Sequence, residues 1–258
     1  MSIKSIILVL WVLAGMYAFR KGPEYRGIRI TYYKVISDNP LETVNKANDG
    51  YEYEFISDLK SSWFGKVSQI DPDGPPPPKV YGGVGRGNIY NNPGKHEKIL
   101  EIYLRHLGGR YLIDKTEHPI QWEIDKSQTR KIAGYTCYKA TGILNTGEGA
   151  DGKPVYKRVT AWFTPQLPYP FGPGVFDGLP GIILAAGYGS SMFVAVEVHL
   201  LHKKPIVHRP EGEVLSYQEY LQRLSAYSKQ HMGVDLVKRI REGVKKRKKE
   251  MQQEQNQN

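Results

Sequence analysis

The feature that most constrains this chain is a series of short stretches in which aromatic or β-branched residues alternate with polar ones. Over residues 51–55 the alternation is strict, with aromatic side chains at the odd positions and glutamates between them. Because successive side chains of a strand point to opposite faces, this period predicts a half-buried β-strand with its carboxylates in solvent. The 18 Tyr, 27 Gly and 17 Pro of the chain favour many such strands joined by turns.

Further stretches with strand character lie along most of the chain. They cover residues 28–36, 99–103, 110–113, 120–124, 131–140, 156–164, 182–186 and 192–201. Their number and shortness predict a mainly β fold: a strongly curved antiparallel sheet or half-barrel of about eight to ten strands, with one or two C-terminal helices. The alternative is a two-sheet β-sandwich, which the period of the pattern does not distinguish from a single curved sheet.

The most structured turn chemistry lies at residues 178–183, which read Gly-Leu-Pro-Gly-Ile-Ile. Proline at position 180 presets φ, and glycine at position 181 suits the positive φ of a type II turn, so we expect a type II turn there. The apolar run that follows and the stretch 192–201 are then joined through a glycine-flanked turn. We expect this hairpin at the buried centre of the fold.

The N-terminus predicts export. Lys4 precedes an apolar run at residues 6–18, which is shorter than the roughly 20 residues that a transmembrane helix needs. Such a run suits a secretory signal peptide over residues 1–18, with an uncleaved anchor as the alternative. The β domain is then expected over residues 19–215, including a loop rich in proline and glycine at residues 71–87.

The C-terminal part changes period. Ser216 and Glu219 have the spacing of a capping box, and apolar side chains then recur at helical intervals. We therefore expect a basic helical segment over residues 216–250 and a disordered polar tail over residues 251–258.

The positive charge is concentrated in that helical segment. Residues 238–249 contain eight basic residues and one acidic residue, a net charge of +7, which leaves +3 of the total of +10 for the rest of the chain. Because the charge lies in the tail while the aromatic residues lie in the strands, the pattern does not favour nucleic-acid binding. It suits docking on an acidic protein or on lipid headgroups, through Lys245, Lys246, Arg247, Lys248 and Lys249.

Three segments in a fixed order resemble a known family. They are residues 178–183, the tryptophan-bearing stretch 161–164, and the Ile-Ala-Gly-Tyr-Thr-Cys segment at residues 132–137. Together they are similar to the GLPGLI family of Bacteroidota envelope proteins, with Ile182 in place of the leucine of that name. The resemblance implies an exported protein encoded near TonB-dependent outer-membrane transporters. It transfers no catalytic residue, and its motif residues are expected to determine the fold: Gly134, Cys137, Gly178, Leu179, Pro180, Gly181 and Ile182.

Residues suited to catalysis are few. Glu197 and His199 would share one face of a strand, and a third ligand could complete a zinc site, so a metal-dependent periplasmic hydrolase is the alternative function. Cys137 is the single cysteine, which excludes an intrachain disulfide. We expect Cys137 to be a small buried residue, with a reactive thiol as the alternative. The sequence assigns no catalytic residue, cofactor or metal.

The remaining candidates are aromatic. Trp122, Tyr135 and Trp162 are expected to line one face of the curved sheet, where an apolar concavity could hold a peptide, a lipid or a partner segment. We therefore expect an exported, non-catalytic protein of the cell envelope, periplasmic or associated with the outer membrane. Its expected role is a binding or accessory component of an outer-membrane transport or secretion system.

Overall fold

The computed structural model describes residues 24–43, 51–69, 87–104, 109–117, 119–148, 153–235, 237–243 and 246. The expected signal peptide (1–18) and C-terminal tail (251–258) lie outside these residues. So does the proline-rich loop, apart from Gly87.

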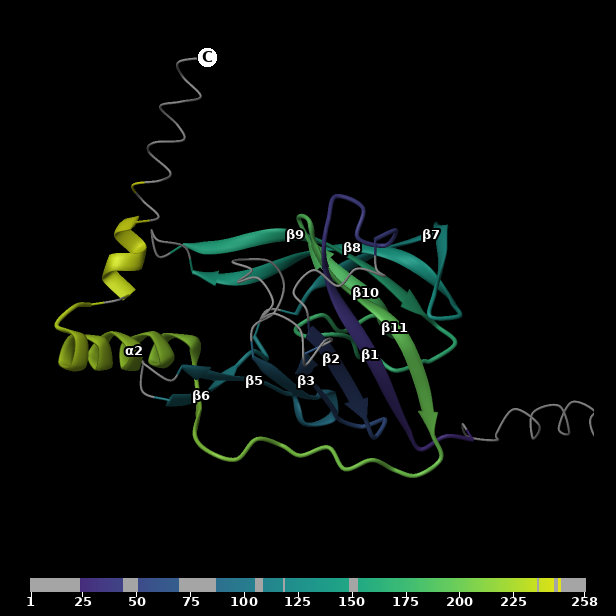
Figure 1. Cartoon of the computed structure of the whole chain (residues 1–258), viewed down its shortest axis with the longest axis horizontal. Coiled ribbons are helices and arrows are strands. Elements are labelled where there is room, and N and C mark those ends of the chain that lie inside the picture. The colour runs from purple at the N-terminus through teal and green to yellow at the C-terminus, as the bar shows by residue number, and fades with distance from the viewer. Residues whose placement is uncertain are drawn as a thin grey trace, which may run out of the picture.

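Twelve strands form one sheet (Figure 1). They are β1 (Gly27–Ile36), β2 (Tyr51–Ser57), β3 (Ser62–Gln69), β4 (Asn88–Asn92), β5 (Glu97–Leu104), β6 (Gly109–Asp114), β7 (Gln121–Ile132), β8 (Tyr135–Glu148), β9 (Pro154–Thr164), β10 (Ile182–Tyr188), β11 (Ser191–Leu201) and β12 (Val214–Leu215). Their order is β12-β6-β5-β4-β3-β2-β1-β11-β10-β9-β8-β7, and only β12 runs parallel to its neighbour. The helices are the 3₁₀ turn η1 (Pro93–Lys95), α2 (Tyr217–Met232) and a helical stretch at residues 237–243.

The prediction of a mainly β, antiparallel fold with C-terminal helices is confirmed. Because all twelve strands belong to one sheet, the two-sheet sandwich is not the fold. The sheet is open, since β12 and β7 at its ends are unpaired with each other, and it is not strongly curled, so the expected half-barrel does not form. The sequence did not indicate β3, β4 and β12. β4 reads Asn-Ile-Tyr-Asn-Asn, and asparagine has low β propensity, so its place depends on pairing with β3 and β5.

The alternating pattern of the middle strands builds the core. In β1, Ile28, Ile30 and Tyr32 are fully buried, whereas the Arg29 between them lies in solvent. The prediction for residues 51–55 is confirmed in the same way, since Tyr53 and Phe55 of β2 are buried and the glutamates are not. Aromatic rings from β2, β3 and β11 pack against one another, and β1 and β11 cross the middle of the sheet (Figure 1). The largest cluster of buried side chains lies here.

The connection between β9 and β10, residues 165–181, is buried with these strands, and we call it the core segment. Leu167, Phe171, Phe176 and Leu179 are each at most 2% exposed. The segment turns at its prolines, where backbone bonds of 2.8 Å span Leu167–Tyr169, Tyr169–Phe171 and Leu179–Gly181. Each bond closes a three-residue turn centred on a proline, whose preset φ suits that turn.

The prediction of a type II turn at residues 179–182 is wrong. Gly181 has no positive φ, and its amide bonds back to the Leu179 carbonyl at 2.8 Å in the turn around Pro180. Gly181 is required for space, because a Cβ there would lie 2.1 Å from the Thr164 carbonyl oxygen. The positive φ of the motif belongs to Gly178, at 87°.

The strand expected at residues 131–140 is a hairpin instead. β7 ends at Ile132 and β8 begins at Tyr135, and these two residues pair across the turn. Ala133 and Gly134 between them have φ of 47° and 85°. Positive φ at both central residues is the mark of a two-residue hairpin turn that matches the twist of its strands. Gly134 was thus a turn signal within a strand-like sequence.

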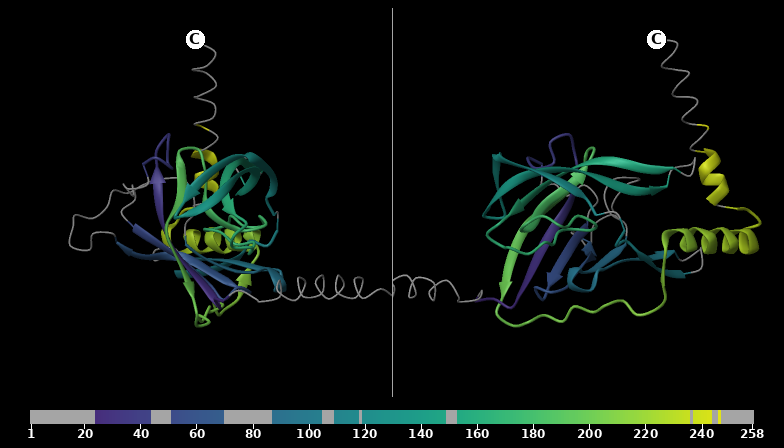
Figure 2. Two further views of the ribbon diagram at one scale, coloured as in Figure 1. Left: turned by 90° about the vertical axis from the view of Figure 1, so that its right-hand side faces the viewer. Right: turned by 180° about the vertical axis from the view of Figure 1, so that it is seen from behind.

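Helix α2 packs at the end of the sheet beside β6 and β12 (Figure 2). The predicted capping box is confirmed, because the Ser216 hydroxyl accepts from the Glu219 amide and the Glu219 carboxylate accepts from the Ser216 amide. The Tyr220 ring meets Tyr111 of β6 edge to face, with ring centroids 5.3 Å apart. Residues 202–213 run along the molecule from β11 to this helix (Figure 1).

Candidate functional site

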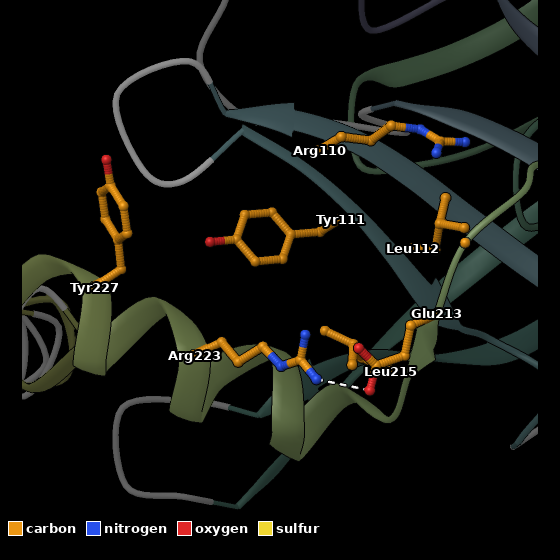
Figure 3. A pocket seen from close by; sticks show the side chains of 8 residues that line it. Arg110, Tyr111, Leu112, Glu213, Leu215, Arg223 and Tyr227 are labelled. Atoms are coloured by element: carbon orange, nitrogen blue, oxygen red, sulfur yellow. Dashed lines mark hydrogen bonds and ion pairs between the residues drawn. The ribbon is translucent and has the colours of Figure 1, made fainter.

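A cavity of about 410 Å³ lies where α2 meets the edge of the sheet (Figure 3). Its walls combine aromatic, aliphatic and charged side chains from β6, β12, α2 and the residues just before β12. The lining residues are Arg110, Tyr111, Leu112, Gly212, Glu213, Leu215, Arg223 and Tyr227.

Two structural features, one within α2 and one between distant strands, bring these side chains together. Arg223 and Tyr227 are four residues apart on α2, so they lie on the same face of the helix, one turn apart. On the sheet, parallel pairing of Val214 with Leu112 and of Leu215 with Ile113 draws the residues before α2 against β6. The cavity therefore depends on strands and a helix that are about 100 residues apart in sequence, since Leu112 and Val214 are the paired positions.

The two arginines of the cavity are held by partners. Arg223 forms an ion pair with Glu213, with the Nη2–Oε1 distance 2.7 Å. Arg110 lies on the other side of Tyr111 and bonds Glu101 through Nε at 2.5 Å and the Glu211 carbonyl through Nη1 at 2.6 Å. These contacts fix the guanidinium groups at the wall, and both side chains keep more than two fifths of their surface exposed.

The two tyrosines supply hydroxyl groups at one end of the cavity. Figure 3 shows the Tyr111 hydroxyl directed toward the side of Tyr227, with Arg223 nearby on the helix. Burial raises the pKa of Tyr111 above its usual value of 10.0, and the nearby Tyr227 raises it further, while Arg223 acts in the opposite direction. The Tyr111 phenol therefore stays protonated at neutral pH. Phenol and guanidinium groups beside leucine side chains suit a ligand that joins an anionic oxygen to an apolar body.

The aromatic residues predicted as a binding face have separate partners. Trp122 donates its indole N–H to the Asp177 carbonyl at 2.7 Å. Trp162 is 8% exposed, and the Arg130 guanidinium lies 5.8 Å from its ring centroid. Tyr135, at the start of β8, is half-buried against the core. None of these three lines the cavity.

The motif region contains a polar cluster around Asp177 that sequence reasoning missed. The Asp177 carboxylate accepts from Asn91 of β4 at 2.6 Å and from the Lys98 ammonium of β5 at 2.8 Å. Its carbonyl is the acceptor for Trp122 of β7. Asp177 and Lys98 side chains are only 16% and 13% exposed, so this ion pair is largely removed from water. An acidic residue next to the Gly-Leu-Pro-Gly motif was the available signal, but its partners lie too far away in sequence to be inferred.

Cys137 is fully buried, as expected for a small core residue. Burial raises the pKa of its thiol to about 12, because the charged thiolate is disfavoured away from water. The thiol therefore remains protonated at neutral pH.

Glu197 and His199 share a face of β11, as expected, with His199 Nε2 2.9 Å from Glu197 Oε1. Both side chains are more than half exposed. Within the described ranges, no group of three His, Cys, Asp or Glu side chains could hold a metal ion. The structure thus brings no third ligand to this pair in that part of the chain.

Of the five tail residues expected to dock on an acidic protein or on lipid headgroups, only Lys246 is described, and it is exposed. Lys245, Arg247, Lys248 and Lys249 lie outside the described residues. Among the helices of the described part, none is long and apolar enough to cross a membrane.

Comparison with known proteins places a family match on the core segment. A family model described as "Protein of unknown function (Porph_ging)" matches residues 150–185, which include β9, the core segment and the start of β10. The matched range contains Asp177 and the Gly-Leu-Pro-Gly motif, whereas the cavity beside α2 lies outside it. No curated protein matches the sequence.

Solved structures offer a likeness of fold. PNGF-II superposes with a TM-score of 0.51 at 16% identity, over 77% of this chain and 33% of the PNGF-II chain. This chain thus spans about a third of that protein. The lipoprotein LppX of Mycobacterium tuberculosis aligns at 10% identity over 72% of this chain and 91% of its own, but with a TM-score of 0.24, which is too low to indicate a shared fold.

Proposed function

We propose that this chain is an exported cell-envelope protein of the GLPGLI type, which binds a partner as an accessory component of an outer-membrane transport or secretion system. The observation that carries this proposal is the cavity between α2 and β6. Its volume of about 410 Å³ falls within the range of about 300–1,000 Å³ common for ligand sites.

The chemistry of the lining favours a peptide segment of the partner. Guanidinium groups bind carboxylates through paired N–H donors, and Arg110 and Arg223 lie on opposite sides of Tyr111 (Figure 3). Tyr227 and Leu215 supply aromatic and aliphatic surface beside them. An acidic residue next to an apolar one would fill such a site, with its carboxylate competing with Glu213 for Arg223.

The test is affinity purification of the tagged, full-length protein from its own envelope, with mass spectrometry of the proteins that accompany it. The cavity variant carries Arg223→Gln and Tyr227→Ala. The matched control is Arg209→Gln, because Arg209 also forms an exposed ion pair, with Glu97 at 3.0 Å, but does not line the cavity.

We expect one stoichiometric envelope partner with the wild type and the control, and its loss with the cavity variant. The proposal of a cavity-bound partner is overturned if all three proteins capture the same partner equally. It is also overturned if the wild type is recovered without any stoichiometric protein, in which case extraction of the sample for bound lipid becomes the next measurement.

A further inference from the structure

Strands β1 to β6 place a row of residues across the face of the sheet opposite the core. Phe55 of β2 is buried in the core, so the Glu54 beside it points to the other face. Strand pairing sets Glu54 beside Gly65 and Asn88 beside Glu101. A Cβ at Gly65 would lie 2.3 Å from the Asn88 side-chain oxygen, so these two positions also adjoin. The polar row, one residue from each strand, is Arg29, Glu54, Gly65, Asn88, Glu101 and Arg110.

Trp63 covers the centre of the polar row. A Cβ at Gly65 would lie 2.6 and 2.7 Å from Cζ2 and Cη2 of the indole, so only glycine leaves room for the ring. Trp63 is half-buried, and it belongs to none of the apolar clusters in the described part of the chain. Its cross-strand neighbour Tyr90, by contrast, belongs to a cluster that Val207 covers. The indole therefore lies on the sheet outside the core.

Two polar groups at this position are available to a ligand. The indole N–H of Trp63 and the side-chain oxygen of Asn88 have no hydrogen-bond partner among the described residues. The indole N–H of Trp122 differs, because it donates to the Asp177 carbonyl at 2.7 Å. A donor and an acceptor thus lie beside an aromatic surface.

The charges of the polar row are balanced. Glu54 pairs with Arg29, with 3.2 Å between Oε2 and Nε, and Glu101 pairs with Arg110 at 2.5 Å. Asn88 donates to the second oxygen of Glu101 at 3.3 Å. Because each carboxylate of the row has its own guanidinium, the row offers no net charge to a ligand. It suits an uncharged ligand with several hydroxyl groups, since carboxylates accept from hydroxyls while amide and guanidinium groups donate to them.

We infer that Trp63 and the polar row form a binding site for a neutral oligosaccharide. A pyranose ring with equatorial hydroxyls has only C–H groups on its flat faces, and such a face packs against an indole as other apolar surfaces do. The hydroxyls at the rim of the ring then lie toward Glu54 on one side of Trp63 and toward Asn88 on the other. This site shares only Arg110 with the cavity beside α2, so the inference goes beyond the proposed function and does not depend on it.

The test is an NMR titration of the purified, nitrogen-labelled full chain with three neutral sugars: cellohexaose, mannohexaose and chitohexaose. The indole N–H signals of the four tryptophans report on each ring separately, and Trp63→Phe assigns the signal of Trp63. We expect at least one sugar to shift the Trp63 signal. The Trp122 signal should stay in place, because its N–H is bonded within the protein.

Two variants remove the stacking surface and the polar contact, each with a matched control. Trp63→Ala is expected to weaken sugar binding by about tenfold, the loss of one aromatic contact. Its control is Tyr156→Ala, which removes a ring that is 61% exposed on β9. Asn88→Ala is expected to weaken binding by about fivefold, the loss of one hydrogen bond. Its control is Asn145→Ala on β8.

The ring over Gly65 also stabilises the sheet, so urea unfolding is measured for each variant. If Trp63→Ala does not fold, binding to Asn88→Ala and its control decides the question, with the Trp63 signal as the readout.

Three outcomes would overturn the inference. The first is that none of the three sugars shifts the Trp63 signal. The second is that the variants and their controls lose binding equally. The third is that hexalysine or hexagalacturonate moves the Trp63 signal at lower concentration than the sugars, which would indicate a charged ligand. The Arg223→Gln and Tyr227→Ala protein should bind the sugars like the wild type, so failure here is distinguishable from failure of the proposed cavity site.

Discussion

At the scale of the residue, the two glycines of the Gly-Leu-Pro-Gly motif are needed for different reasons. Gly178 occupies a left-handed conformation with φ of 87°, and a Cβ there would meet only the Trp122 indole nitrogen, at 3.9 Å. Gly181 has no such conformation but lies against the backbone of Thr164. A backbone oxygen cannot move aside as a side chain can, so steric contact excludes a larger residue at position 181. At position 178 there is space, and the positive φ is what disfavours any residue other than glycine.

This difference predicts unequal costs for the two alanine substitutions. Gly178→Ala should lower the free energy of unfolding by about 1 kcal/mol, the cost of a left-handed non-glycine residue. Gly181→Ala should lower it by about 3 kcal/mol or more, because the end of β9 must shift. Urea unfolding of both variants checks this, and equal losses would contradict the assignment of contact to Gly181 alone.

At the scale of the element, Asp235 connects α2 to the helical stretch at residues 237–243, and its carboxylate caps that stretch. This cap responds to acid. The pKa of Asp235 is lowered from 3.8 to about 2, first by the Lys238 amide bond and then by the Lys229 side chain. A carboxyl group whose pKa is depressed by folding stabilises the fold above its unfolded pKa. That stabilisation is lost as the pH falls through the folded pKa.

The hydrogen bond from the Lys238 amide to the Asp235 carboxylate should therefore persist down to about pH 4. It should be lost as the pH falls from 3.8 toward about 2 and the carboxylate becomes protonated. The measurement is the NMR shift of the Lys238 amide across this range, with the Ile30 amide of β1 as a monitor of global unfolding. Asp235→Asn should show no such transition. A Lys238 midpoint at the ordinary aspartate value would contradict the cap.

At the scale of the whole molecule, Asp177 connects distant parts of the sheet. Through it the core segment bonds β4 and β5 on one side and β7 at the far edge. The Asp177 and Lys98 side chains are mostly buried. Removal of either one therefore leaves the charge of the other without a partner and largely out of water. The ion pair therefore ties the core segment to the sheet in one arrangement.

A double-mutant cycle tests this role. Asp177→Asn and Lys98→Met should each lower the free energy of unfolding by about 2 kcal/mol, somewhat less than for a fully buried pair. The double variant should lose about 1–2 kcal/mol less than the sum of the two single losses. The control cycle on Arg223 and Glu213, an exposed pair, should show coupling below about 1 kcal/mol. Additive losses at Asp177 and Lys98 would mean that the two side chains stabilise the fold independently.

Much of the fold was predictable because its signals are local. The strict alternation at residues 51–55 and the period-two pattern of β1 determine which side chains face the core, whatever the neighbouring strands are. The capping box at Ser216 needs only three residues of sequence separation. Where the local signal was ambiguous, as at Ala133 and Gly134, a turn was read as part of a strand.

The candidate site was not predictable, since its residues converge through long-range pairing. Tyr111 and Tyr227 are ordinary sheet and helix residues by sequence, and only the docking of α2 on β6 brings them to one cavity. Trp122 has the aromatic character of a binding residue, yet its indole N–H is taken by Asp177, 55 residues away.

The sequence by itself determined the class of fold, the C-terminal capping box and the concentration of charge after residue 238, because each follows from neighbours along the chain. The tertiary structure decided the order of the strands, the conformation of the Gly-Leu-Pro-Gly motif and the position of the cavity. Gly181 shows the reason: a Cβ there would lie 2.1 Å from the Thr164 carbonyl oxygen, and this close packing of the motif against the end of β9 leaves no trace in the local pattern.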